Sequence, residues 1–433
     1  YWEVRRLGGR ESPVNREQLT IAASMIAGVV AAIPVFLMAR QQPAPPPPLT
    51  PPSQRVIDVT WTPEIPDLTV EPQESATEPS LTEEGEEKIQ RRISALAEGL
   101  SRMWTRSPER LVRVIDRASR AVDQSPPVTL LLAIAHAETN GKILDVSEAG
   151  AVGLAQATPV AYRQERFSGK LFVTHDYVLG ARAYMVKKPL GDAYKVATVA
   201  LEKKENSSSR ARKLLRSAMA LRREGLDELD HLRPFAPEGF YESIEDADRY
   251  NQATLEHLGQ LLEAGDRELL EEFRDRMKRE YTALREEQAL YWKSYQRDLV
   301  QRRDALLVRR FGAPMKRLDE ELVYEASEYL ARKLDDRFSA THMASFLVQH
   351  LETKRLEAQK LARASRNVER MTAALYNGGS HNVKRMLAGL IASLPETDRY
   401  MKKVPATRRR LDAEVARVEA SVIKPERRAR RTR

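Results

Sequence analysis

A helical spacing of apolar residues runs from about residue 83 to residue 404, and it constrains the fold more than any other feature. Ile89, Ile93, Leu96 and Leu100 lie three or four positions apart, which places them on one face of an α-helix. Glycine is scarce, and no run of short alternating strands appears. Because 42% of the residues are hydrophobic, the chain can bury a sizeable core. The body is therefore predicted to be mainly α.

Residues 187–315 carry a different helical pattern, in which apolar residues are set among dense charges. Over residues 269–299 the apolar and aromatic positions again recur three or four apart. Gly265 and Asp266 interrupt the stripe, Asp266 suits a helix N-cap, and Gly312 ends the pattern. We expect one short and one very long helix, paired as a coiled-coil-like hairpin. The aromatic residues are predicted to serve packing rather than a binding cleft.

An uncharged apolar run over residues 19–39 is long enough to span a bilayer as a helix. Arginines precede it and an acidic segment follows, so residues 1–18 are predicted to be cytoplasmic and the body to lie across the membrane. The alternative is a cleaved signal peptide, for which residues 37–39 are a poor cleavage site. Residues 40–82 hold eleven of the 24 prolines, which predicts an extended linker.

Several common enzyme classes lack their signatures in this sequence. The chain has no cysteine, which excludes disulfides, thiolate metal sites and a cysteine nucleophile. No phosphate-binding loop, GxGxxG, GxSxG or HExxH motif occurs. His342 and His350 could share a helix face, but a core or surface histidine is the better interpretation. We expect neither a metal nor another cofactor.

The most informative segment spans residues 126–159. Two prolines start a helix in which Leu131, Ile134 and Glu138 fall on one face at positions i, i+3 and i+7. A carboxyl group at the end of an apolar stripe is desolvated, which favours its neutral form and suits a general acid. The pattern alone has low specificity, because a glutamate at a helix end is usually solvated.

This segment resembles the catalytic motif of the lytic transglycosylase family with a soluble-lytic-transglycosylase (lysozyme-like) domain. That family has a helix ending in Glu-Ser, a serine nine residues past the glutamate, and then GAxGLMQxxP. Glu138 and Thr139 stand for the first pair, Ser147 for the serine, and residues 150–159, GAVGLAQATP, for the rest. Thr139 and Ala155 replace the family's serine and methionine, and the catalytic carboxylate is retained.

Two further segments resemble the family's other motifs, in the same order. Residues 373–383, AALYNGGSHNV, resemble AxYNAGxxNV, although Gly378 replaces alanine. Residues 396–404, ETDRYMKKV, resemble ETxxYVxKV. The family also has a helix of the pattern N-I-x-x-G-x-x-Y-L, for which residues 177–185 and 322–330 are both candidates.

The resemblance, which covers roughly residues 110–186 and 316–404, implies a division of the body. A lysozyme-like transglycosylase domain would comprise residues 83–186 and 316–404, interrupted by a helical insertion over residues 187–315 that the chemistry does not need. Residues 405–433 hold a dense cluster of lysine and arginine and are predicted to be a basic tail.

Family members cleave the β-1,4 bond between N-acetylmuramic acid and N-acetylglucosamine in peptidoglycan and leave a 1,6-anhydro product. The resemblance implies that Glu138 acts as acid and then base, and that Tyr376 hydrogen-bonds near it. Packing in the cleft wall is an equal alternative for Tyr376 and Gln156. The resemblance further implies that Ser147, Gln156 and Asn377 orient the glycan. Thr139, Glu396 and Tyr400 complete the implied site, and a structural role is favoured for Glu396 and Tyr400.

Peptidoglycan glycan strands are thus the expected partner, in the bacterial cell envelope outside the cytoplasmic membrane or in a virion. The insertion is expected to contact an envelope machine or virion partner, and the basic tail to contact anionic polymers. The alternative function is a non-catalytic peptidoglycan-binding or scaffold protein on the same fold, which the insertion and the changed motif residues favour.

Overall fold

The computed structural model describes residues 83–103, 108–362 and 368–431. The predictions for residues 1–18, 19–39 and 40–82, including the anchor and the linker, lie outside the described residues. Within these described ranges, no helix combines the length and the apolarity needed to cross a membrane.

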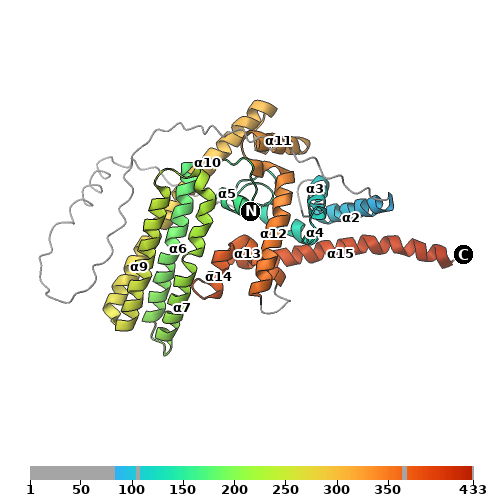
Figure 1. The fold of residues 1–433 in the computed structure, drawn as a ribbon. Coiled ribbons are helices and arrows are strands. Elements are labelled where there is room, and N and C mark those ends of the chain that lie inside the picture. Colours follow the sequence, from blue (N-terminus) through green and yellow to red (C-terminus); the bar gives the residue numbers. More distant parts are fainter. Residues whose placement is uncertain (1–82, 104–107, 363–367, 432–433) are drawn as a thin grey trace, which may run out of the picture. The chain divides into compact units, whose positions relative to one another are not determined.

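The described ranges consist of helices and connecting loops, which confirms that the body is mainly α. They contain no β-strand, and isolated bridges pair Val146 with Val152 and Val152 with Ala157 in one loop. In chain order the helices of Figure 1 are α2(Glu83–Ser101), α3(Glu109–Arg120), α4(Val128–Thr139), α5(Pro159–Gln164), α6(His175–Leu201), α7(Ser207–Leu221), α8(Glu224–Asp227), η1(Glu228–Phe235), α9(Phe240–Ala264), α10(Arg267–Phe311), η2(Met315–Arg317), α11(Glu320–Lys333), η3(Asp336–Phe338), α12(Ala340–Leu361), α13(Val368–Gly378), α14(Ser380–Leu387) and α15(Pro395–Arg431).

A first hydrophobic core surrounds helix α4, whose residues 130–135 are all buried. Helices α3, α12 and α15 contact α4 directly, and α2 packs on α3 and α15. A helix that is apolar on every side must be covered on every side, because each exposed apolar face would cost free energy. Helix α4 is therefore the central helix of this core, and only its two ends reach the surface.

A second hydrophobic core lies between the C-terminal half of α6, helices α7 and α9, and the N-terminal half of α10. Helices α6 and α10 lie antiparallel along each other (Figure 1). Gly180 meets the Trp292 ring and Gly191 meets the Tyr281 ring, and a Cβ at Gly180 would come within 2.5 Å of Trp292. Glycine at these positions thus lets the large rings of α10 approach the backbone of α6.

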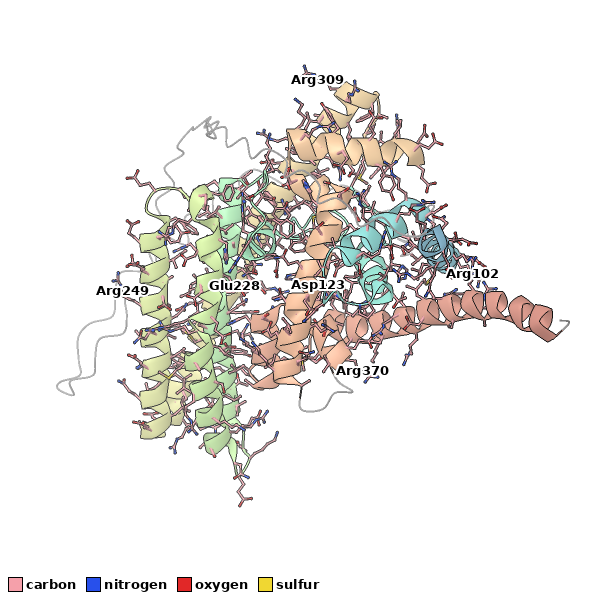
Figure 2. The ribbon with its side chains drawn as sticks, turned by 45° about the vertical axis from the view of Figure 1, so that its right-hand side comes forward. Arg102, Asp123, Glu228, Arg249, Arg309 and Arg370 are labelled. Atoms are coloured by element: carbon pink, nitrogen blue, oxygen red, sulfur yellow. The ribbon has the colours of Figure 1, made fainter. Side chains whose placement is uncertain are left out.

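Charged side chains cover the outside of this second core. Figure 2 shows the exposed Arg249 of α9 projecting away from the helices. A solvated charged face opposite a buried apolar stripe explains the dense charges of the sequence pattern in this region.

The predicted hairpin over residues 187–315 is partly wrong. Asp266 caps α10, since its Oδ1 accepts a hydrogen bond from Leu269 N at 3.1 Å, and Gly312 ends the helix with φ +71°. However, α9 is 25 residues long rather than short. The main partner of α10 is α6, because the aromatic rings of α10 fit the two glycines of α6.

The predicted insertion boundaries do not separate two bodies. Helix α6 runs without a break through residues 186 and 187. The C-terminal half of α10 buries Tyr295, Leu299 and Leu307 in the first core, where Leu229 of η1 is also buried. The sequence pattern could not reveal this, because an apolar stripe does not specify which core it enters.

The predicted tail also requires correction, because residues 405–431 continue helix α15. Leu411 is fully buried in the first core. The arginines of this stretch are paired in part, as Arg417 bonds to Glu98 of α2 at 2.9 Å. The helix extends past residue 404 because α2 provides a surface for its apolar side.

Replacing Asp266 with alanine is expected to lower the free energy of unfolding by about 1 kcal/mol, the usual contribution of an N-cap side chain. Chemical denaturation measures the difference. Asp266→Asn keeps a capping oxygen and is the matched control, so it should remain close to the wild type. Equal losses in both variants would show that the cap does not stabilise α10.

Candidate active site

Glu138 lies in the last turn of α4, where the helix leaves the first core. The helix starts after Pro127 and ends at Asn140, whose φ of +54° is left-handed. Glu138 is partly exposed, whereas residues 130–135 are buried. The predicted position of a carboxyl group at the end of an apolar stripe is therefore confirmed.

Burial raises the pKa of Glu138 from its ordinary value of 4.5 to about 7. The Tyr400 hydroxyl and the Lys403 ammonium act in the opposite direction, and the charge of Glu396 adds to the increase. A carboxyl group with a pKa near neutral can both give and take a proton at physiological pH. In these surroundings Glu138 is thus suited to general acid and base chemistry.

Two tyrosines from distant helices stand beside Glu138. The rings of Tyr376 in α13 and Tyr400 in α15 are nearly parallel, with centroids 6.4 Å apart. Burial, with the charge of Glu138, raises both phenol pKa values well above 10, so both hydroxyls stay neutral donors. Tyr376 Oη donates to Ala155 O at 2.9 Å. The Tyr400 hydroxyl interacts with Glu138, although not in the geometry of a regular hydrogen bond.

The loop over residues 145–157 carries two of the predicted site residues. Ser147 Oγ accepts from Ala151 N at 3.0 Å, which closes the loop. Gln156 has a left-handed φ of +47°, and its Nε2 donates to Gly153 O at 3.0 Å. Ala155 O, the acceptor for Tyr376, immediately precedes Gln156. The loop is thus held by its own hydrogen bonds and is tied to the Glu138 surroundings through Tyr376.

The remaining predicted site residues differ in their placement. Asn377 Oδ1 accepts from Thr397 Oγ1 at 3.0 Å, which joins the second and third motifs. Glu396 is exposed and acts on Glu138 only through its charge. Thr139 is buried, and its hydroxyl donates to Ala135 O within α4 at 3.3 Å. The structure therefore brings Glu138, Tyr376, Tyr400 and Glu396 together. The Thr139 hydroxyl, in contrast, is used in a hydrogen bond within α4.

Two groups lie near the site although the sequence did not predict this position for them. Lys403 Nζ donates to His136 O at 3.4 Å, one turn beyond Tyr400, and its charge reaches Glu138. The buried His350 ring meets the Tyr376 ring edge-on at 5.2 Å, and its Nδ1 lies 2.8 Å from Glu165 Oε1. The residue pattern Tyr-x-x-Lys on one helix face could have indicated Lys403. No local signal pairs His350 with Glu165, which is 185 positions away.

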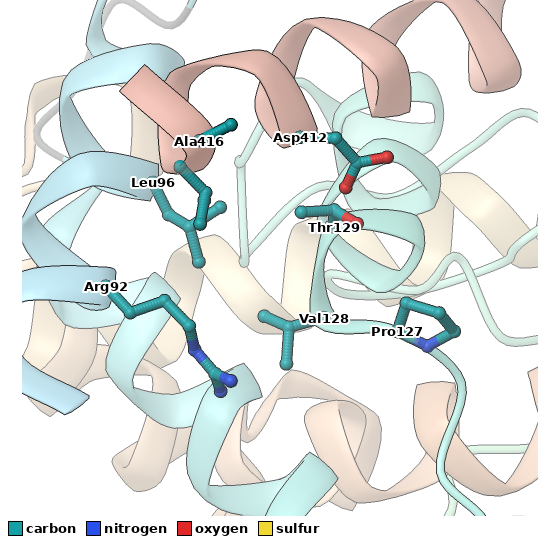
Figure 3. Close-up of a pocket in the computed structure, with 8 residues that line it drawn as sticks. Arg92, Leu96, Pro127, Val128, Thr129, Asp412 and Ala416 are labelled. Carbon is teal, nitrogen blue, oxygen red and sulfur yellow. The ribbon is translucent and has the colours of Figure 1, made fainter. Parts of the chain in front are cut away.

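Across the described ranges, no group of three or more histidine, aspartate or glutamate side chains is arranged to hold a metal ion. A pocket, shown in Figure 3, lies at the opposite end of α4 from Glu138. Val128, which lines the pocket, and Glu138 are ten positions apart in α4, a rise of about 15 Å along the helix axis. The pocket is lined by Arg92, Leu96, Pro127, Val128, Thr129, Asp412, Val415 and Ala416.

Replacing Glu138 with glutamine is expected to stabilise the protein above pH 7 and to make no such difference below pH 4.5. Between these values the native carboxyl group binds a proton that the unfolded chain has lost, so wild-type stability falls as pH rises. The expected gain at pH 8 is roughly 1–3 kcal/mol. Chemical denaturation across pH measures it, with Glu148→Gln, at an exposed carboxyl group, as the control. A constant difference at every pH would contradict the raised pKa.

Comparison with protein families, with curated proteins and with solved structures finds no match to this chain.

Proposed function

We propose that this chain is a peptidoglycan lytic transglycosylase with a lysozyme-like catalytic region. The observation that carries the proposal is the partly exposed Glu138, with a pKa of about 7, beside Tyr376 and Tyr400. These three residues come from the three segments that resemble the family's motifs, and they are far apart in the sequence. Their meeting at one place is what a shared site requires.

The proposed reaction needs one carboxyl group and no water. Glu138 donates its proton to the glycosidic oxygen as the bond from that oxygen to C1 of the muramic acid breaks. The carbonyl oxygen of the substrate's N-acetyl group bonds to C1 and stabilises the positive charge. The Glu138 carboxylate then takes the proton of the 6-hydroxyl, whose oxygen bonds to C1 and displaces the carbonyl oxygen. Glu138 is protonated again, and a 1,6-anhydro product is released.

A pKa near neutral supports both halves of this cycle, because the same group must be an acid first and a base next. Ordinary glycosidases use two carboxyl groups, one of which activates water or attacks the sugar. The neutral Tyr400 hydroxyl can stabilise the Glu138 carboxylate between the two steps. In this proposal Ser147, Gln156 and Asn377 orient the glycan along the loop and α13.

The proposed setting is the bacterial cell envelope, where residues 19–39 would anchor the chain in the inner membrane and the linker would hold the catalytic region outside the cytoplasm. A virion is the second setting that this substrate allows. The helices around the second core and the basic residues of α15 would then contact an envelope or virion partner and anionic polymers.

Incubation of the full chain with purified peptidoglycan, followed by mass spectrometry of the released muropeptides, tests the proposal. A transglycosylase releases 1,6-anhydromuramoyl ends, whereas a hydrolase releases ends that are one water heavier. Binding of the protein to sedimented peptidoglycan without release of either product would contradict the proposal and favour the non-catalytic scaffold. Release of only the hydrated product would be consistent with Glu138 as the acid, but it would show that the chain is a hydrolase and not a transglycosylase.

A further inference from the structure

A fully buried ionic network lies beneath the loop over residues 145–157. The guanidinium of Arg337, in η3, donates two hydrogen bonds to Asp335, Nε to Oδ1 at 3.0 Å and Nη2 to Oδ2 at 2.6 Å, and Arg337 N donates a third to Oδ1 at 3.0 Å. Both side chains are completely buried. Asp335 also accepts from Phe172 N at 2.9 Å, so its charge is well satisfied. Burying such a pair is costly, and the cost is offset only when the other hydrogen-bonding groups are satisfied.

The other donors of Arg337 end on the loop and on α10. Nη1 donates to Ala157 O at 2.9 Å and to Gly150 O at 3.3 Å. Nη2 donates to Tyr295 Oη at 3.0 Å, and Tyr295 Oη itself donates to Phe172 O at 2.8 Å. Tyr295 is a residue of the long helix α10, so α10 and the loop share one set of buried hydrogen bonds.

The loop also rests directly on these residues. Gly150 has a φ of +72°, and a Cβ there would lie 2.1 Å from Tyr295 Cε1. At Gly153, with a φ of +75°, a Cβ would lie 2.1 Å from Arg337 O. Two features therefore require glycine at each position: the left-handed backbone and a neighbouring atom that leaves no room for a side chain.

We infer that Tyr295 and Arg337 are positioning residues that hold the loop carrying Ser147 and Gln156 in place beside Glu138. The connection runs from α10 through Tyr295 and Arg337 to the loop carbonyls, and then from Ala155 O to Tyr376, which stands beside Glu138. The helix that the sequence assigns to a dispensable insertion is thus part of the site's support. The effect on catalysis rests on the proposed function, whereas the effect on the loop does not.

Tyr295→Phe is the variant that tests this inference in the full chain. It removes the hydroxyl but keeps the ring that packs under Gly150, so the fold should persist. Tyr281→Phe is the matched control, since Tyr281 lies on the same helix and its ring meets Gly191 of α6. Amide hydrogen exchange and the kinetics of anhydro-product release are measured for both variants.

Tyr295→Phe removes two buried hydrogen bonds, the one from Arg337 Nη2 and the one to Phe172 O. It is expected to speed amide exchange over residues 145–157 by roughly tenfold or more and to leave α7 and α9 unchanged. We expect kcat to fall by a similar factor with little change in KM, because the loop orients a substrate that other groups also bind. A uniform increase of exchange across the chain, or a loop no faster than in Tyr281→Phe, would overturn the inference.

The proposed function and the positioning role of Tyr295 can be contradicted independently. If the wild type releases no anhydro product but the loop responds as expected, the positioning role stands and the proposed function falls. If the wild type cleaves peptidoglycan and Tyr295→Phe changes neither exchange nor kcat, the function stands and the positioning role falls.

Discussion

Replacing Glu138 with glutamine is expected to reduce release of anhydro-muropeptides by about 10²–10⁴-fold, the usual effect of losing a general acid. Glutamine has nearly the same shape but cannot give up a proton to the glycosidic oxygen. The fold should be retained, because the variant also removes a charge that is unfavourable in this desolvated position. Product release is measured by mass spectrometry of digests taken at several times.

Glu148→Gln is the matched control, since Glu148 is an exposed carboxyl group in the loop that follows α4. It should retain wild-type activity. A Glu138→Gln variant that keeps more than about a hundredth of the wild-type rate would remove Glu138 from the role of general acid. Circular dichroism of both variants separates lost chemistry from lost structure.

Joining residue 186 to residue 316 through a short Gly/Ser linker is expected to unfold the protein. The deletion removes Tyr295, Leu299 and Leu307, all fully buried in the first core. Truncating one buried leucine to alanine costs about 2–5 kcal/mol, and an aromatic side chain about 3–5 kcal/mol. The sum is similar to the whole stability of a typical domain, about 5–15 kcal/mol. Near-UV circular dichroism and thermal unfolding measure the outcome.

A Gly/Ser insertion next to Gly265 is the control for cutting into this region. Gly265 lies in the turn between α9 and α10, and a Cβ there would meet no atom within 4 Å. An insertion at such a turn should be tolerated, because loop cost grows slowly with length. A deletion variant that unfolds cooperatively and still cleaves peptidoglycan would restore the boundary that the sequence predicts.

The features that the sequence predicted correctly are local ones. Apolar spacing predicted the helices, Asp266 predicted the start of α10, and Gly312 predicted its end. The spacing of Leu131, Ile134 and Glu138 also predicted a carboxyl group at the end of a buried stripe. Caps and helix faces depend on residues within a few positions of one another, so a single segment contains the information needed.

The predictions that were wrong concern which surface a helix packs against. An amphipathic stripe demands a covering surface but does not specify which one. The assignment of α10 to a separate hairpin was wrong for this reason, since Gly180 and Gly191 of α6 receive its rings. The same limit made residues 405–431 look like a tail, although Leu411 packs in the first core.

By itself, then, the sequence determined a mainly helical body and a carboxyl group in a desolvated position. Only the tertiary structure decided how strongly that position perturbs the pKa of Glu138, because its burial depends on the packing of distant helices and because Tyr400, Glu396 and Lys403 lie more than 250 residues away. It alone decided that Tyr295 supports the loop, since hydrogen bonds between Arg337 and residues of α10 and the loop form only when three distant segments meet. The apolar periodicity of a helix depends on a single segment, whereas the charge environment of a side chain is the sum of contributions from all the segments that fold around that side chain.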